Sequence, residues 1–127
     1  MNAPVSASAL AAGPFRDLTL AVSKNLGALR KDQPDMMAGF SALAAAATRD
    51  GALNKKTKEL IALALGVAAH CDACIGFHMQ TLVKPGASRA EVEEALGMAV
   101  YMGGGPSLMY SANALAAYDE FGAPAAG

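Results

Sequence analysis

Residues Glu59 to His78 read ELIALALGVAAHCDACIGFH, and this stretch decides how the rest of the sequence is interpreted. An almost uninterrupted apolar run follows Glu59, and the stretch closes on Cys71, Cys74 and His78 in the spacing C-x2-C-x3-H. These are the only two cysteines of the chain, and His78 is one of only two histidines. Two thiols three positions apart beside an imidazole indicate redox chemistry.

The composition predicts a single all-α domain. The chain has 127 residues, the usual size of one domain. Hydrophobic residues make up 54% of it, above the roughly 45–50% typical of soluble domains. Much of the excess is alanine, leucine and methionine, which favour helices. We therefore expect more apolar surface than one small domain can bury, and hence a homo-oligomer.

Charge and hydropathy exclude several classes of protein. The formal net charge is −1, and no broad basic surface for nucleic acid is predicted. No apolar stretch approaches the roughly 20 residues that span a bilayer, and the N-terminus lacks the pattern of a signal peptide. We expect a cytoplasmic protein, where a CxxC pair is more often catalytic or metal-binding than structural. The most basic stretch, Lys55, Lys56 and Lys58, is interpreted as a solvated helix start, with docking of an acidic partner as the alternative.

Apolar residues recur every three to four positions along most of the chain, as they do on one face of a helix. The expected domain covers residues 14–121, between flexible tails at 1–13 and 122–127. Its helices are expected at about 14–31, from Pro34 to a C-terminal cap at Gly51, at about 55–69 and 73–84, after Ser88, and from Pro106 to about Phe121. Expected N-caps are Asn54, Asp72 and Ser88, the last in a capping box with Glu91. Met79, Met98, Met102 and Met109 are interpreted as core residues.

The local spacing assigns roles to the cysteines. If Asp72 caps a helix, Cys74 lies in its first turn, where free N–H groups and the helix dipole stabilise a thiolate. His78 follows one turn later on the same face, within reach as a base. We therefore expect Cys74 to attack a peroxide and become a sulfenic acid. Cys71, just outside the helix, would then resolve it to a disulfide.

Two questions stay open at this level. In a straight helix Glu59 stands about 18 Å from Cys71, so it reaches the site only through a helical hairpin or from another subunit; otherwise it is an exposed residue of the first turn. The C-x2-C-x3-H pattern also supplies three of the four ligands of a structural zinc site. A fourth ligand is not evident, because His70 is awkwardly adjacent to Cys71 and is interpreted as a helix-end residue. The redox interpretation is favoured.

The pattern E-x11-C-x2-C-x3-H, occupied by Glu59, Cys71, Cys74 and His78, resembles the core of the AhpD-like alkylhydroperoxidase family. That family belongs to the wider carboxymuconolactone decarboxylase superfamily. The resemblance covers about residues 50–121, through KKTKELIALALGVAAHCDACIGFH and SRAEVEEALGMAVYMGGGPSLMYSANAL.

The resemblance implies an antiparallel bundle of about six helices that assembles as trimers or hexamers. It also implies reduction of an organic hydroperoxide, with electrons from a dithiol such as a lipoyl group or a thioredoxin-like protein, and a proton relay through Glu59 and His78. No metal or organic cofactor is expected. Well-studied members place a second histidine between the cysteines, whereas this chain has Asp72 and Ala73, which predicts a simpler relay.

Two rivals remain. One is a carboxymuconolactone decarboxylase-like lyase on the same fold, although such lyases generally lack the cysteine pair. The other is a redox-sensing or zinc-binding interaction protein without catalytic activity.

Overall fold

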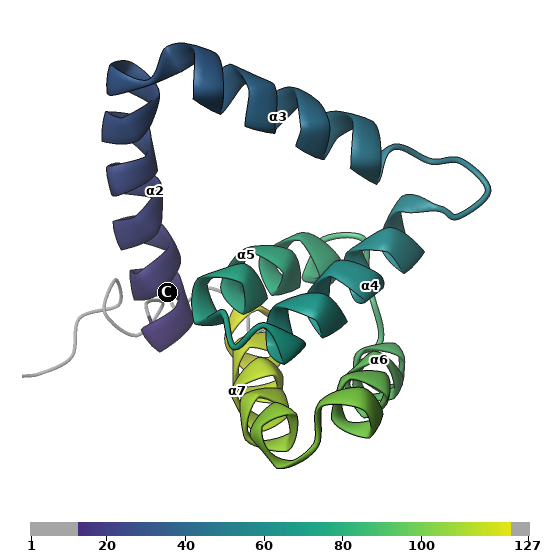
Figure 1. The fold of residues 1–127 in the computed structure, drawn as a ribbon. Coiled ribbons are helices and arrows are strands. Elements are labelled where there is room, and N and C mark those ends of the chain that lie inside the picture. Colours follow the sequence, from purple (N-terminus) through teal and green to yellow (C-terminus); the bar gives the residue numbers. More distant parts are fainter. Residues whose placement is uncertain (1–12, 123–127) are drawn as a thin grey trace, which may run out of the picture.

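The computed structural model describes residues 13–122, and within them the chain forms six helices and no strands (Figure 1). The helices are α2 (Pro14–Asp32), α3 (Pro34–Thr48), α4 (Lys55–Ala68), α5 (Asp72–Val83), α6 (Arg89–Gly103) and α7 (Gly105–Gly122). The all-α prediction is therefore confirmed for this part of the chain. The tails predicted at 1–13 and 122–127 fall almost entirely outside the described residues.

Several helix ends lie where their capping residues predict. The Asn54 side chain accepts a hydrogen bond from the Thr57 N–H at 2.8 Å, which starts α4. Ser88 and Glu91 form both halves of the capping box that starts α6. Gly86, with φ of 83°, lies in the turn after α5, where a side chain would be strained.

Three predicted boundaries were wrong. Helix α3 ends at Thr48 because Arg49 turns to extended backbone, so Gly51 is not its cap. Helix α5 begins at Asp72 itself, because Cys71 occupies the N-cap position and its sulfur accepts the Cys74 N–H. Helix α7 begins at Gly105, one residue before the predicted Pro106.

Helices α4 to α7 enclose the core. Helix α4 packs against α5 and α6, and α7 packs against the same two helices (Figure 1). Their facing sides supply the apolar residues that are fully buried: Leu63, Val67, Ile75, Met79, Leu82, Val92, Ala114 and Ala117. Burial of each large side chain contributes roughly 1.5–3 kcal/mol before the entropic cost of ordering it.

Helix α2 is attached to this bundle by its first two turns. Phe15 and Thr19 are buried against α5, where Gly76 leaves room for them. The free backbone N–H groups of Phe15 and Arg16 donate to the carboxylate of Glu120 at 3.2 and 2.7 Å. Because Gly13 has no side chain to cap the helix, a residue of α7 does so instead.

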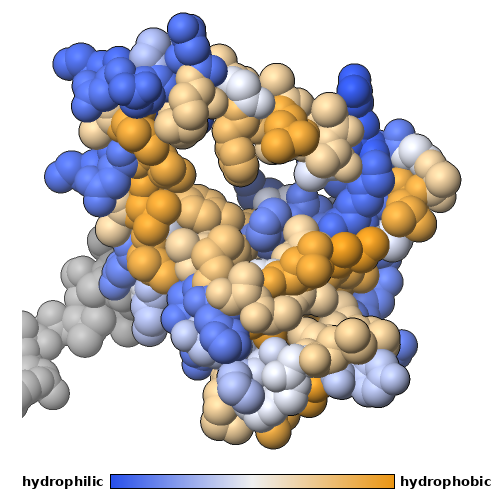
Figure 2. Space-filling model, viewed as in Figure 1, coloured by the Kyte–Doolittle hydropathy of each residue, from blue (hydrophilic) through white to orange (hydrophobic). Residues whose placement is uncertain are grey.

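The rest of α2 and all of α3 (residues 20–48), which we call the α2–α3 arm, project away from the bundle (Figure 1). Its apolar residues are largely exposed: Phe40 is 63% and Leu43 is 64% accessible. Figure 2 shows hydrophobic surface along both helices of the arm. In the single chain, most apolar side chains of the arm therefore have no core to face.

Exposed apolar residues continue beyond the arm. On α4, Leu65 is 64% accessible, so this helix is not buried on every side within one chain. The prediction that Met98, Met102 and Met109 belong to the core was wrong, since all three are exposed, whereas Met79 is fully buried as expected. Four helices of this length have fewer inward positions than the sequence has apolar residues.

The turn between α4 and α5 has an unusual residue. The Cys71 N–H bonds to the Gly66 carbonyl and the His70 N–H to the Val67 carbonyl, both at 3.0 Å, which is the pattern of a Schellman motif. The left-handed position of this motif is normally glycine, yet His70 occupies it with φ of 57°. Its ring stacks on Tyr110 of α7, with centroids 4.7 Å apart.

This arrangement predicts different stabilities for two variants at His70. Both His70→Gly and His70→Ala remove the stack on Tyr110, but only glycine relieves the backbone strain. We expect the glycine variant to be more stable than the alanine variant by about 1 kcal/mol. Urea denaturation of both proteins measures the difference. Equal stabilities would contradict the strained turn.

Candidate active site

The α4–α5 hairpin brings Glu59 and His78 together. Oε2 of Glu59 lies 2.6 Å from Nδ1 of His78. The Glu59 side chain is only 7% exposed, whereas that of His78 is 34% exposed. The sequence left open whether Glu59 is an exposed helix-start residue or is met by another subunit. The structure shows that it is buried and that its histidine partner belongs to the same chain.

This contact accounts for the polar atoms of both side chains that face each other. A buried carboxylate needs a hydrogen-bond donor to offset its lost hydration, and the Nδ1–H of His78 supplies one. In the tautomer whose Nδ1–H donates to Glu59, the imidazole has its lone pair on Nε2. The pair can therefore accept a proton at Nε2, and the carboxylate stabilises the imidazolium that results.

Cys71 and Cys74 are joined by a disulfide across the first turn of α5, and their Cα atoms are 5.2 Å apart. Both sulfurs lie at the helix N-terminus. The Cys74 N–H donates to the sulfur of Cys71 at 3.1 Å. Since Cys71 is the capping residue, the helix-terminus argument favours a thiolate at either position and does not by itself select Cys74.

The position of His78 does distinguish the two cysteines. Cys74 precedes it by four residues, which places their Cβ atoms about 5–6 Å apart on one face of α5. Cys71 is a further turn away. His78 and Cys74 are therefore neighbours by helical geometry, and Cys71 lies beyond them.

Neighbouring helices hold the cysteine turn closely. At Gly66 a Cβ atom would lie 3.2 Å from that of Cys74, so α4 approaches α5 where it has no side chain. From α7, Asn113 donates to Asp72 at 3.4 Å, and Tyr110 stacks on His70. No motif of the sequence identifies Asn113 or Tyr110 as a residue of this turn.

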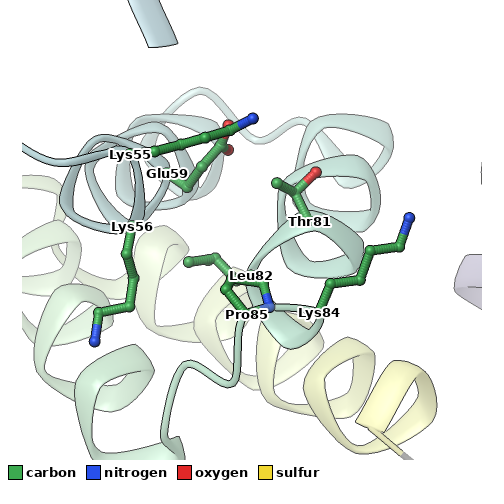
Figure 3. A pocket seen from close by; sticks show the side chains of 7 residues that line it. All are labelled: Lys55, Lys56, Glu59, Thr81, Leu82, Lys84 and Pro85. Carbon is green, nitrogen blue, oxygen red and sulfur yellow. The ribbon is translucent and has the colours of Figure 1, made fainter. Parts of the chain in front are cut away.

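A pocket of about 410 Å³ adjoins the site at the other end of the hairpin (Figure 3). It is lined by Lys55, Lys56, Glu59, Thr81, Leu82, Lys84 and Pro85. Glu59 thus borders this pocket and contacts His78. Among residues 13–122 no three His, Cys, Asp or Glu side chains converge as a possible metal site. None of the helices described there is long and apolar enough to cross a bilayer.

Comparison with known proteins agrees with this fold. A crystal structure of a carboxymuconolactone decarboxylase family protein from Legionella pneumophila superposes with a TM-score of 0.85 at 61% identity, covering 86% of this chain and 97% of that one. A family protein from Thermotoga maritima, described as possibly involved in antioxidative response, gives 0.72 at 30% identity, covering 80% and 87%.

Sequence relatives extend the match. An uncharacterized protein of Cupriavidus necator is 41% identical over 102 residues, which span 80% of this chain and 90% of the relative. The sequence model of the carboxymuconolactone decarboxylase family matches residues 34–117, which include the hairpin, both cysteines and the Glu59–His78 pair. By its sequence and its fold, this chain belongs to the carboxymuconolactone decarboxylase family.

Proposed function

We propose that this chain is a thiol-dependent alkyl hydroperoxidase of the AhpD type. The observation that carries the proposal is a CxxC disulfide one helical turn from a histidine that is bonded to a buried carboxylate. Activation of a thiol by an adjacent base that is itself oriented by a third group is a general pattern of nucleophilic catalysis. Cys71, Cys74, His78 and Glu59 are the proposed catalytic residues.

In the reduced protein, Nε2 of His78 takes the proton of the Cys74 thiol, and Glu59 stabilises the imidazolium. The thiolate attacks the terminal oxygen of a hydroperoxide. The O–O bond breaks, Cys74 becomes a sulfenic acid, and the departing alkoxide takes the proton from His78 to leave as an alcohol. The Cys71 thiol then displaces water from the sulfenic acid and forms the disulfide. An external dithiol, such as a lipoyl group or a thioredoxin-like protein, returns both cysteines to thiols and is itself oxidised to a disulfide.

The description of the Thermotoga maritima relative, possibly involved in antioxidative response, supports this reaction class. A lyase of the same family is the second candidate, because the Glu59–His78 pair can transfer a proton without thiols. The two candidates differ in one requirement. Replacing both cysteines by serine abolishes the peroxidase reaction and leaves a lyase active.

We also propose a homo-oligomer, a trimer or hexamer, because the arm and α4 expose apolar side chains that water solvates poorly. Light scattering is expected to give the mass of three or six chains. Phe40→Asp together with Leu43→Asp should shift the protein to smaller species, because both residues are exposed in the single chain. Lys24→Asp, at an exposed polar position of α2, is the control and should change nothing. A monomeric wild type would overturn the proposal.

The thiols provide the most direct test of the reaction. One equivalent of an organic hydroperoxide should consume both thiols of each reduced chain within seconds, and a dithiol should restore them. Cys71→Ser should stop at a sulfenic acid on Cys74 that dimedone traps, whereas Cys74→Ser should not react at this rate. If both thiols survive in the wild type, the peroxidase proposal is wrong. Trapping in the Cys74→Ser variant instead would reverse the two roles.

The Glu59–His78 pair predicts a graded loss of rate. His78→Gln removes the base, and the peroxide reaction should slow by about 100-fold or more. Glu59→Gln keeps an oxygen that accepts the Nδ1–H but loses the charge that stabilises imidazolium, so a smaller loss is expected. Glu94→Gln, at an exposed position of α6, is the matched control. Stopped-flow thiol oxidation measures all three, and an unchanged rate in His78→Gln would exclude this histidine as the base.

A further inference from the structure

The pocket beside the catalytic pair combines apolar walls with a cationic rim. Leu82, Pro85 and the aliphatic stems of the lysines form its walls, between the start of α4 and the end of α5 (Figure 3). Its volume of about 410 Å³ lies within the range of roughly 300–1,000 Å³ that small-molecule sites occupy. Apolar walls with few charged groups are typical of such sites.

The charges of this region do not cancel. Nζ of Lys56 lies 2.7 Å from Glu91, and the hydrogen bond from this lysine is the largest cause that lowers the pKa of Glu91. Lys58, outside the pocket, donates to the Arg49 carbonyl at 2.7 Å. The ammonium groups of Lys55 and Lys84, by contrast, have no carboxylate within ion-pairing distance among residues 13–122.

The one carboxylate at the pocket, Glu59, is already bonded to His78. Since Lys55 and Lys84 add two positive charges and Glu59 only one negative charge, the lining of the pocket keeps a net positive charge. Figure 3 shows Lys55 extending over Glu59 toward α5, and Lys84 extending from the end of that helix. Both side chains are exposed and flexible, so they can close on an anion at the mouth of the pocket.

The pocket is connected to the proposed catalytic residues through Glu59 and α5. Thr81 and Leu82 follow His78 by about one helical turn, and Cys74 precedes it by one turn. The pocket and the cysteines therefore lie on opposite sides of the Glu59–His78 pair, and a substrate held in the pocket has to extend past this pair to reach Cys74.

We propose that this pocket binds the carboxylate end of an amphipathic acid with an unbranched aliphatic chain. The carboxylate lies at the rim between Lys55 and Lys84, and the chain lies against Pro85, the methyl group of Thr81 and the lysine stems, with Leu82 buried behind them. A small polar anion would lack the apolar contacts. A neutral chain would leave the two ammonium groups without a partner. Resting on the proposed function, the pocket then favours carboxylate-bearing hydroperoxides over neutral or cationic ones.

Binding can be tested without any turnover. Titration calorimetry on the full chain should detect sodium decanoate at one site per chain, with 1-decanol and decyltrimethylammonium binding more weakly. Affinity should rise roughly three- to fourfold per methylene from octanoate to decanoate. It should fall about three- to tenfold in the Lys55→Gln/Lys84→Gln double variant and also in high salt. Lys31→Gln, an exposed lysine of α2, is the matched control.

The proposal is overturned if decanol binds as tightly as decanoate, if the double variant binds like Lys31→Gln, or if decanoate does not bind at millimolar concentration.

A kinetic comparison tests the link to substrate choice. For hydroperoxides of equal length, the double variant should raise KM for the carboxylated one alone and leave kcat unchanged. An equal change in KM for both hydroperoxides would show that the pocket does not select the substrate by its carboxylate. If decanoate binds but the thiols do not react with peroxide, the binding proposal stands and the peroxidase proposal is wrong. If peroxide consumes the thiols but decanoate does not bind, the peroxidase proposal stands and the binding proposal is wrong.

Discussion

The hydrogen bond between Glu59 and His78 constrains the geometry of the whole hairpin. A carboxylate this deeply buried needs a compensating donor, and His78 provides it from the facing helix. A shift of one residue along α5 would rotate the imidazole by about 100° and remove the donor. The register of α4 against α5 therefore has to be held accurately, and so does every residue that depends on α5, including both cysteines.

That register is held at the opposite end of the hairpin. The motif around Ala69, His70 and Cys71 closes α4 with two backbone hydrogen bonds and turns the chain directly into the cap of α5. A histidine in the left-handed position carries a conformational cost that glycine would avoid. Its stack on Tyr110 ties the turn to α7. Gly66 removes the remaining obstacle by letting the two helices meet at Cys74.

Local features of the structure could be predicted from the sequence, and long-range ones could not. Helix ends can be identified because the residues that form them act on backbone groups only a few positions away. Examples are Asn54, Ser88 with Glu91, and Gly86. Periodicity alone cannot show that Val92 and Leu96 are buried whereas Met102 on the same helix is exposed, because burial depends on which helices pack there. The spacing C-x2-C-x3-H located the cysteine pair. The partner of Glu59 could not be located in this way, because the two helices meet through a left-handed turn at His70, a position where glycine is the usual residue.

The cap that Glu120 provides to α2 also determines when the fold can be completed. The two backbone groups it satisfies lie 104 and 105 residues earlier in the chain. At about 5–20 residues per second, a ribosome takes roughly 5–20 s to make that intervening segment. Throughout this interval the first turn of α2 has only water for these hydrogen bonds. The earliest helix of the described residues 13–122 therefore completes its docking only after Glu120 has been synthesised.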